Sequence, residues 1–173
     1  YIGFVLGAMG ADYYPRLTEA INDHARTRQL VNEQTEMALL LAGPALLVMI
    51  TFAPWAIHLL YAESFVPASE VLRWQALGDI LKVASWPMGF ILLAQGRGNI
   101  FIVTELTWNV VYLGTIAFGM RDFGLVITGV GFWFAYLIYF FVMLAVALAL
   151  TGYKPNRRNW VLMIFLLLAG GLI

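Results

Sequence analysis

Apolar residues dominate this chain in long runs separated by shorter polar segments. Four runs are long enough to cross a bilayer as a helix, which takes about 20 mainly apolar residues: 37–57, 74–95, 100–119 and 125–150. The runs at 1–11 and 160–173 are shorter, and we expect them to be partial spans of a chain cut from a longer protein. The pattern predicts an all-α, polytopic membrane bundle.

The polar segments predict the connections. Region 12–36 mixes charged residues with loosely spaced apolar ones, so we expect either a loop or an amphipathic helix lying on the membrane surface. Pro15 is expected to end the first helix, because proline has no backbone N–H to donate. Shorter turns are expected at 63–70, 96–99 and Arg121–Gly124.

Basic residues predict the orientation, since short loops rich in Lys and Arg stay in the cytoplasm. Loops taken alternately place seven basic residues on one side and two, Arg73 and Arg121, on the other; the seven are Arg16, Arg26, Arg28, Arg97, Lys154, Arg157 and Arg158. We therefore expect loops 12–36, 96–99 and 151–159 to be cytoplasmic.

Composition supports a membrane protein and narrows its chemistry. The chain is 62% hydrophobic and 12% charged, with a mean hydropathy of +0.82, as in integral membrane proteins. Zero net charge gives no indication of a nucleic-acid partner. There is no cysteine, and His24 and His58 lie far apart, so neither a metal site nor a cofactor is expected. Without a Walker loop or a nucleophile motif, we do not expect an enzyme.

The apolar run at 74–95 is unusual because it contains Asp79 and Lys82. Each charge at a helix centre costs about 2.5 to 3.5 kcal/mol of insertion free energy, whereas a Leu, Ile, Phe or Val returns about 0.3 to 0.6. At helical spacing Gln75, Asp79, Lys82 and Trp86 share one face. We expect this face to line a cavity; the alternative is that Asp79 and Lys82 only neutralise each other inside the bundle.

Four further residues are candidates for the same cavity. Glu105, with Asn109 one turn later, lies about 9 Å inside the next span, so it reaches either the cavity or the interface. Arg97 is either ordinary positive charge of a cytoplasmic loop, or it meets a substrate at the cytoplasmic opening of the cavity. Arg73 either attracts anions at the outer end or anchors its helix there.

Several short segments resemble the Wzx-type polysaccharide flippases of the multidrug/oligosaccharidyl-lipid/polysaccharide exporter superfamily, in particular those of enterobacterial common antigen synthesis. The segments that carry the resemblance are Trp74-Gln75, Gly78-Asp79, Leu81-Lys82-Val83, Gly89, Ala94 and Glu105, with Tyr14–Thr18 and Ile57–Leu60 plus Phe65 upstream. Individually these patterns are weak, and their order and spacing carry the likeness over about residues 10–150.

The resemblance implies two six-helix bundles facing a central cavity, with this chain forming most of the C-terminal one. It implies that an undecaprenyl-pyrophosphate-linked oligosaccharide moves between leaflets of the bacterial inner membrane by alternating access. Implied partners are this lipid-linked oligosaccharide, membrane lipids, a polysaccharide polymerase and a chain-length regulator. In this interpretation Lys82, helped by Arg73 or Arg97, attracts the pyrophosphate, and Asp79 holds Lys82 and exchanges protons.

Other functions remain open. One is a cation-coupled drug or metabolite antiporter of the same superfamily, and another is a non-transporting membrane assembly protein in which Asp79 and Lys82 dock a neighbouring helix. An enzyme acting on a lipid-linked sugar is the weakest alternative. The apolar run that begins at Trp160 departs from the resemblance and leaves a fourteen-helix relative with another glycan open.

Overall fold

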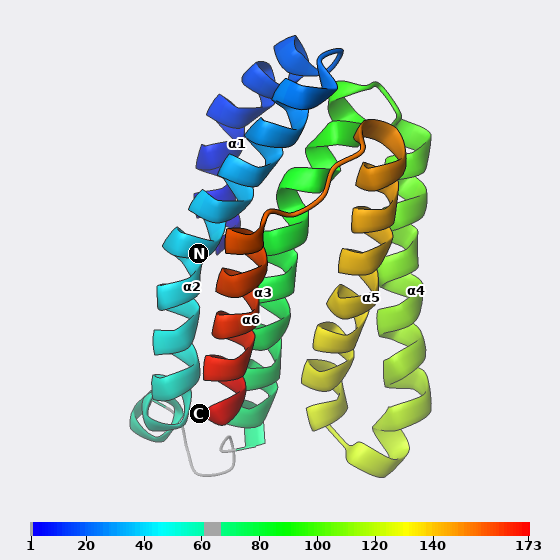
Figure 1. Ribbon diagram of the computed structural model, residues 1–173. Helices are drawn as coiled ribbons and strands as arrows, with labels where there is room; N and C mark the ends of the chain where they lie inside the picture. The colour runs from blue at the N-terminus through cyan, green and yellow to red at the C-terminus, as the bar shows by residue number, and fades with distance from the viewer. Residues whose placement is uncertain (1, 61–66) are drawn as a thin grey trace.

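The computed structural model describes residues 2–60 and 67–173, and in these ranges it contains helices and no strands (Figure 1). The described helices are α1 (Ile2–Ala20), α2 (His24–Leu60), α3 (Pro67–Ala94), α4 (Gly98–Phe123), α5 (Val126–Thr151) and α6 (Arg157–Leu172). Four stretches are long and apolar enough to cross a membrane: His24–Trp55, Ala68–Ala94, Gly98–Phe123 and Val126–Thr151. The all-α prediction is confirmed, and each stretch expected to span overlaps one of these four, with ends that differ by one or two residues where it extends beyond it.

The polar region at 12–36 is helical except for the turn at 21–23, so the expected loop is wrong, and so is the expected end of the first helix at Pro15. The position of this region on the membrane surface stays a prediction. Helix α1 continues through Pro15 to Ala20, and α2 begins at His24 after a turn of three residues. Tyr13 and Leu17 are fully buried in the bundle. Their packing outweighs the one helical hydrogen bond that Pro15 removes. The carboxylate of Asp23 caps α2 by accepting from the backbone N–H groups of residues 25 and 26, at 2.9 and 3.0 Å.

The other connections are shorter than expected, because the helices extend past the apolar runs. The turn between α3 and α4 occupies 95–97, where Gly96 has a φ of +66° that favours glycine. Residues 124–125 join α4 to α5, and 152–156 join α5 to α6. Most of the turn expected at 63–70, with Phe65, lies outside the described residues, and α3 has begun by Pro67.

Helix α3 is the centre of the bundle and contacts all five other helices (Figure 1). Ala76, Ile80, Val83 and Ile91 on this helix are completely buried. Helix α4, by contrast, packs mainly against α5 and exposes a long apolar face made of Ile102, Val103, Leu106, Val110, Leu113 and Phe118. An exposed apolar face of this kind is suited to contact with lipid.

Glycines allow the closest approaches between α3 and α5. A Cβ added at Gly129 would lie 2.7 Å from the backbone oxygen of Val71, and one at Gly78 would lie 2.6 Å from a ring carbon of Phe132. Gly129, near the start of α5, therefore serves close helix packing. These contacts fix the position of α5 against the central helix.

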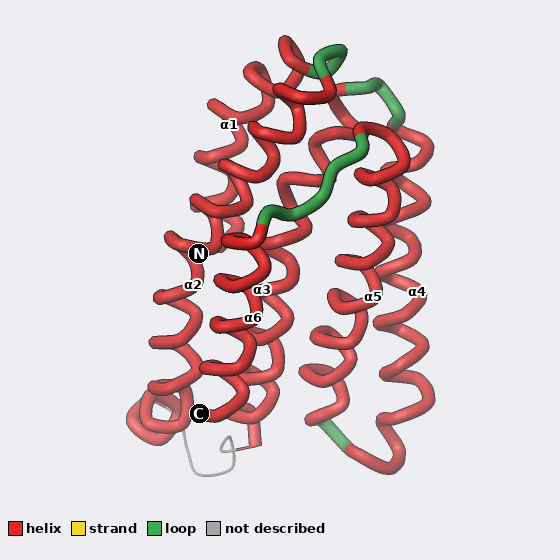
Figure 2. The backbone as a smooth tube through the Cα atoms, in the orientation of Figure 1, coloured by secondary structure: helices red, strands yellow, loops and turns green. Residues whose placement is uncertain are grey.

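The turns at 21–23 and 95–97 and the loop at 152–156 lie at one end of the bundle, as the alternating topology requires (Figure 2). Asn32 of α2 holds the loop at 152–156: its Nδ2 donates to the Lys154 carbonyl at 3.2 Å, and its Oδ1 accepts from the Asn156 N–H at 2.8 Å. Burial raises the pKa of Tyr153 in this loop to about 12. The assignment of this end to the cytoplasm stays a prediction.

Candidate functional site

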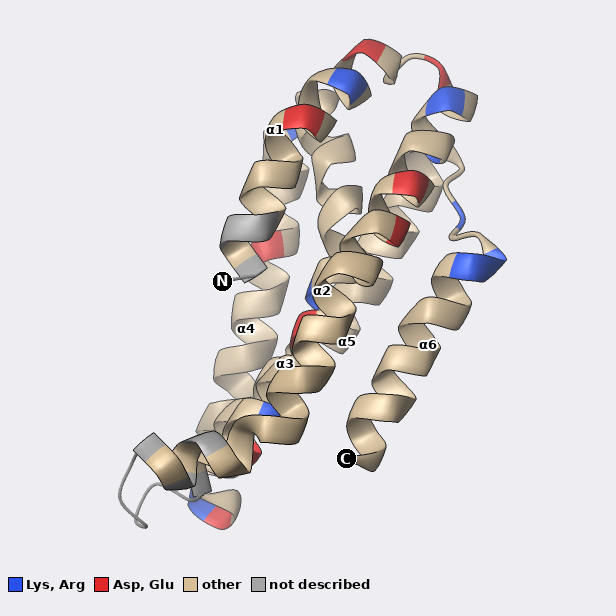
Figure 3. Cartoon of the chain, turned by 90° about the vertical axis from the view of Figure 1, so that its left-hand side faces the viewer, with Lys and Arg blue, Asp and Glu red and all other residues tan. Residues whose placement is uncertain are grey.

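Charged residues are most frequent in the half of the bundle that holds the turns at 21–23 and 95–97 (Figure 3). Asp79 and Lys82 lie about 22 and 18 Å along α3 from its end at Ala94. In a hydrocarbon layer of about 30 Å that starts at Ala94, Lys82 is close to mid-depth and Asp79 is about 8 Å from the far interface. The pair is therefore the feature of the helical core that most needs a functional or structural explanation.

Asp79 and Lys82 contact each other. The Nζ of Lys82 lies 3.7 Å from the Oδ1 of Asp79, and 37% of the Lys82 side chain and 18% of the Asp79 side chain are exposed. The same ammonium lies 5.8 Å from the ring centre of Tyr136 on α5, within the range of a cation–π contact. The pair is thus neither sealed in an apolar contact nor fully open.

Lys82 lines an open cavity of about 200 Å³ between α3, α4 and α5. Its lining residues combine charge, hydroxyl groups and aromatic rings: Lys82, Ser85, Trp86, Glu105, Trp108, Tyr136 and Tyr139. Glu105 therefore lies at the cavity, which was one of the two outcomes expected for it. We call this space the Lys82 cavity.

Glu105 is held in place by a tyrosine from the neighbouring helix. The hydroxyl of Tyr139 donates to Oε1 of Glu105 at 2.6 Å, a distance typical of a short hydrogen bond to a carboxylate. This bond joins the inner face of α4 to α5 at the cavity. Glu105 on one wall and Lys82 on another give the cavity both an acceptor and a donor.

Two aromatic clusters contribute the rings of the cavity wall. Trp108 stacks on Tyr112 with 5.1 Å between ring centres and lies 5.2 Å from Tyr136. Trp86 lies 4.8 Å from Phe90 and also contacts Tyr13 of α1, with 6.1 Å between ring centres. The Trp108 and Trp86 side chains are therefore each packed against further aromatic rings behind the cavity wall.

The other sequence candidates lie outside the Lys82 cavity. Asn109 is exposed, and its amide donates to the backbone oxygen of Glu105 at 2.9 Å. Arg97 is exposed in the turn before α4, and Gln75 is half-buried one turn before Asp79. Arg73 lines a separate open cavity of about 250 Å³ with Glu70, Trp74, Leu77, Gly170 and Gly171. The structure therefore brings together Asp79, Lys82 and Glu105, but not these four.

Sequence reasoning missed the aromatic half of the site. In the aromatic run at 132–141, Phe134 and Phe141 are exposed. Tyr136 and Tyr139 instead line the Lys82 cavity, and the Tyr139 hydroxyl contacts Glu105 of α4. Two tyrosines three residues apart in an apolar span were the available signal, because buried tyrosine hydroxyls usually find a polar partner.

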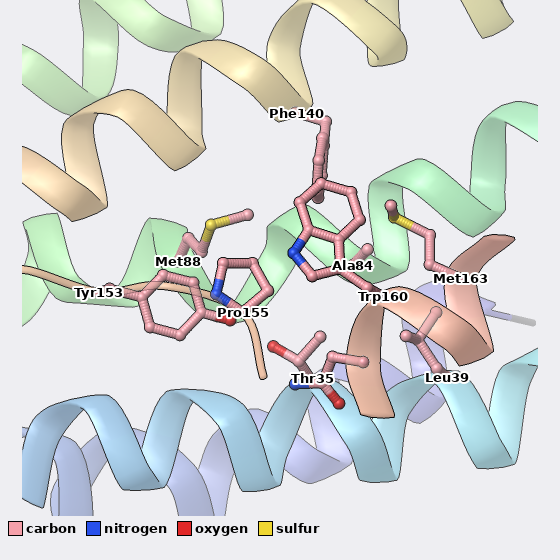
Figure 4. Close-up of a pocket in the computed structure, with 10 residues that line it drawn as sticks. Thr35, Leu39, Ala84, Met88, Phe140, Tyr153, Pro155, Trp160 and Met163 are labelled. Carbon is pink, nitrogen blue, oxygen red and sulfur yellow. The ribbon is translucent and has the colours of Figure 1, made fainter. Parts of the chain in front are cut away.

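A second interior space lies under the loop at 152–156 but is too small for a substrate. Tyr153, Pro155, Trp160, Met88 and Phe140 surround it in Figure 4. Its volume is about 10 Å³, close to the minimum that holds one water molecule. Of these two spaces, only the Lys82 cavity can hold part of a solute.

The Lys82 cavity is suited to binding. It offers an ammonium donor, carboxylate and hydroxyl groups and flat aromatic faces, the combination by which apolar pockets orient a polar ligand. In the described part of the chain, no three His, Asp or Glu side chains form a group that could hold a metal ion.

Comparisons with known proteins relate the chain to membrane flippases over part of its length. It is 23% identical over 107 residues to the lipid III flippases of Escherichia coli (strain K12) and Shigella flexneri, a match that covers 62% of this chain and 26% of each relative. The chain thus spans about a quarter of the length of these curated relatives. No protein-family model and no solved structure matches it. The helical fold, the four apolar helices and this similarity together indicate a multi-pass membrane protein with a flippase-like relationship.

Proposed function

We propose that this chain is part of a flippase that moves an undecaprenyl-pyrophosphate-linked oligosaccharide from the inner to the outer leaflet of the bacterial inner membrane. The observation that carries the proposal is the partly exposed Asp79–Lys82 pair at mid-depth, beside an open cavity that also contains Glu105. The partial similarity to lipid III flippases supports the same class of cargo.

The physical reason concerns the polar head of the cargo. A glycan that crosses the hydrocarbon layer loses the hydrogen bonds that water gave it, and each unmet polar group is costly. A protein route must replace those bonds at mid-depth, where ionisable side chains are otherwise selected against. The cavity provides such groups on three helices, and the helices around it shield them from lipid.

Alternating access then requires a second bundle to close the other side of the route. We infer that this chain supplies the C-terminal bundle of such a pair, and that α3 lines the path. A polysaccharide polymerase and a chain-length regulator are proposed partners, since they would act on the translocated glycan. The transport of the cargo requires no cofactor in this proposal.

The cation-coupled antiporter alternative is less well supported. A bound organic cation would compete for the aromatic face of Tyr136, where the Lys82 ammonium already lies 5.8 Å from the ring centre. The Lys82 ammonium would repel a cation bound on that ring face, because like charges repel strongly in a medium of low dielectric constant.

Complementation tests the proposal. The protein expressed from its complete gene is introduced into a strain that lacks its own flippase, and surface glycan is measured. We expect Lys82→Ala to abolish complementation while the protein remains in the membrane, because the cavity loses its ammonium. Arg97→Ala, at an exposed turn, serves as the matched control and should complement normally. Full complementation by Lys82→Ala would remove Lys82 from the mechanism.

A charge swap separates transport from simple docking. In the double variant Asp79→Lys and Lys82→Asp, an ion pair can still form at the same place. An assembly protein would keep its function, whereas a cavity that presents the ammonium to a cargo at one position should lose it.

A further inference from the structure

We propose that the Lys82 cavity binds a sugar ring of the glycan rather than the pyrophosphate of the carrier. This inference rests on the proposed function and names the part of the cargo that the cavity recognises. It replaces the expectation, drawn from sequence, that Lys82 attracts the pyrophosphate. Charge, aromatic lining and an unpaired donor carry it.

The charge around the cavity disfavours a pyrophosphate. Asp79 and Glu105 supply two carboxylates against the single ammonium of Lys82, so with all three ionised the formal sum is −1. The ammonium is already in contact with a carboxylate oxygen at 3.7 Å. Anion sites in proteins usually gather several cationic donors or backbone N–H groups. Arg73 and Arg97, the expected helpers, do not line this cavity.

The lining instead has the features that a sugar ring requires. A pyranose has one face of C–H groups, which carry slight positive charge and pack well on the negative face of an aromatic ring. Trp86 and Trp108 come from two separate aromatic clusters and both line the cavity. The hydroxyl groups at the rim of a pyranose can donate to Glu105 and accept from Lys82.

The indole of Trp108 adds a donor that lacks a partner. Its Nε1 is buried and has no hydrogen-bond acceptor among the described residues. Buried donors without acceptors are rare, and each calls for a cause. The nitrogen is covered in this conformation, so the indole must turn slightly for an acceptor to reach it. A sugar hydroxyl or ring oxygen seated against Trp108 is such an acceptor.

Binding of soluble sugars to the complete protein tests the inference. The purified full-length protein in detergent is titrated in a calorimeter with methyl β-D-glucopyranoside, N-acetylglucosamine, glucuronate and inorganic pyrophosphate in turn. We expect saturable binding of at least one saccharide and none of pyrophosphate. Trp108→Leu should weaken saccharide binding at least tenfold, and Trp108→Phe, which keeps an aromatic face but lacks the N–H donor, should weaken it less.

Trp55→Leu is the matched control, because Trp55 is 65% exposed on α2 and does not line the cavity. It should bind saccharide as the unmodified protein does. Thermal melting of each variant shows whether it is folded, and if Trp108→Leu does not fold, the comparison rests on Trp108→Phe against Tyr136→Leu. Three results would overturn the inference: no saccharide binds, saccharide binding is unchanged in the folded cavity variants, or pyrophosphate binds and is lost in Lys82→Gln.

A separate flipping assay keeps this inference distinct from the proposed function. Vesicles that contain the complete protein are supplied with the lipid-linked oligosaccharide or with undecaprenyl pyrophosphate alone. Preferential movement of the glycan-bearing lipid agrees with a sugar-binding cavity. Equal movement of both would leave the flippase in place and refute recognition of the sugar. Movement of neither refutes the proposed function, whereas the titrations still decide what the cavity binds.

Discussion

Replacing Gly129 by alanine probes the contact that positions α5 on the central helix. The added Cβ would lie 2.7 Å from the Val71 oxygen and 2.9 Å from the Cα of the same residue. Both are backbone atoms of α3, so they cannot rotate away as a side chain would. An ordinary contact begins near 3.4 Å, and the helices must therefore separate locally by about 0.7 Å, the difference between these distances.

Two opposing effects set the size of the change. Alanine favours a helix over glycine by at most about 1 kcal/mol. Overpacking of a well-packed interior costs about 1–3 kcal/mol, and contact with the backbone of α3, which cannot rotate away, places Gly129→Ala toward the upper end. We therefore expect the free energy of unfolding to fall by about 1–2 kcal/mol. Gly114 of α4 is the matched control, because nothing lies within 4 Å of the Cβ that alanine would add there.

Thermal melting of the full-length protein in detergent measures the effect. Gly129→Ala should melt below the unmodified protein, and Gly114→Ala should melt at the same temperature or slightly higher. Saccharide or cargo binding should also weaken in Gly129→Ala, because Tyr136 and Tyr139 lie on the displaced helix. Equal melting temperatures for the two alanine variants would refute the close α3–α5 contact described above.

Three further predictions concern the ends of the bundle and the cavity. Asn32→Ala removes three side-chain hydrogen bonds to the 152–159 segment, so the free energy of unfolding should fall by about 2–3 kcal/mol in denaturant titrations. Tyr139→Phe leaves the Glu105 carboxylate without its 2.6 Å donor and should lower it by about 1.5–3 kcal/mol. The chain has no cysteine of its own, so in a cysteine-free background Arg121→Cys should react with a membrane-impermeant maleimide added outside, and Lys154→Cys only after permeabilisation.

Each of these predictions has a contrary result. Melting of Asn32→Ala like the unmodified protein would mean that the loop is held by packing alone. The control is Tyr14→Phe, at an exposed tyrosine. Unchanged stability of Tyr139→Phe would show that water replaces the Tyr139 hydroxyl as the hydrogen-bond donor to Glu105. Labelling of Lys154→Cys from outside in intact cells would reverse the orientation expected from the basic loops.

The apolar runs were sufficient to predict the spans and the central place of the helix at 74–95, because hydrocarbon length and the cost of buried charge are local properties of the chain. The helical region at 12–36 was not predictable in the same way. Its burial depends on Tyr13 and Leu17 meeting α3 and α2, contacts that no local pattern contains.

The candidate site likewise has a part that is predictable from local sequence and a part that depends on tertiary contacts. Asp79 and Lys82 could be paired from their spacing within one helix. The position of Glu105 beside Lys82 depends on how α4 and α5 rotate against α3, so the sequence left two outcomes open for it. Tyr136, Tyr139 and Trp108 were missed because their role arises only when three helices come together.

The attachment of α4 matters for the proposed cargo, which joins a hydrophilic glycan to a hydrophobic isoprenoid chain. This helix carries Glu105 on one side and a row of bare aliphatic residues on the other, and it is anchored mostly by α5. In the proposed flippase, α4 alone would separate the Lys82 cavity from the acyl chains on its other side. A molecule with a long isoprenoid tail could keep that tail outside the protein throughout, while its head travels alone through the interior.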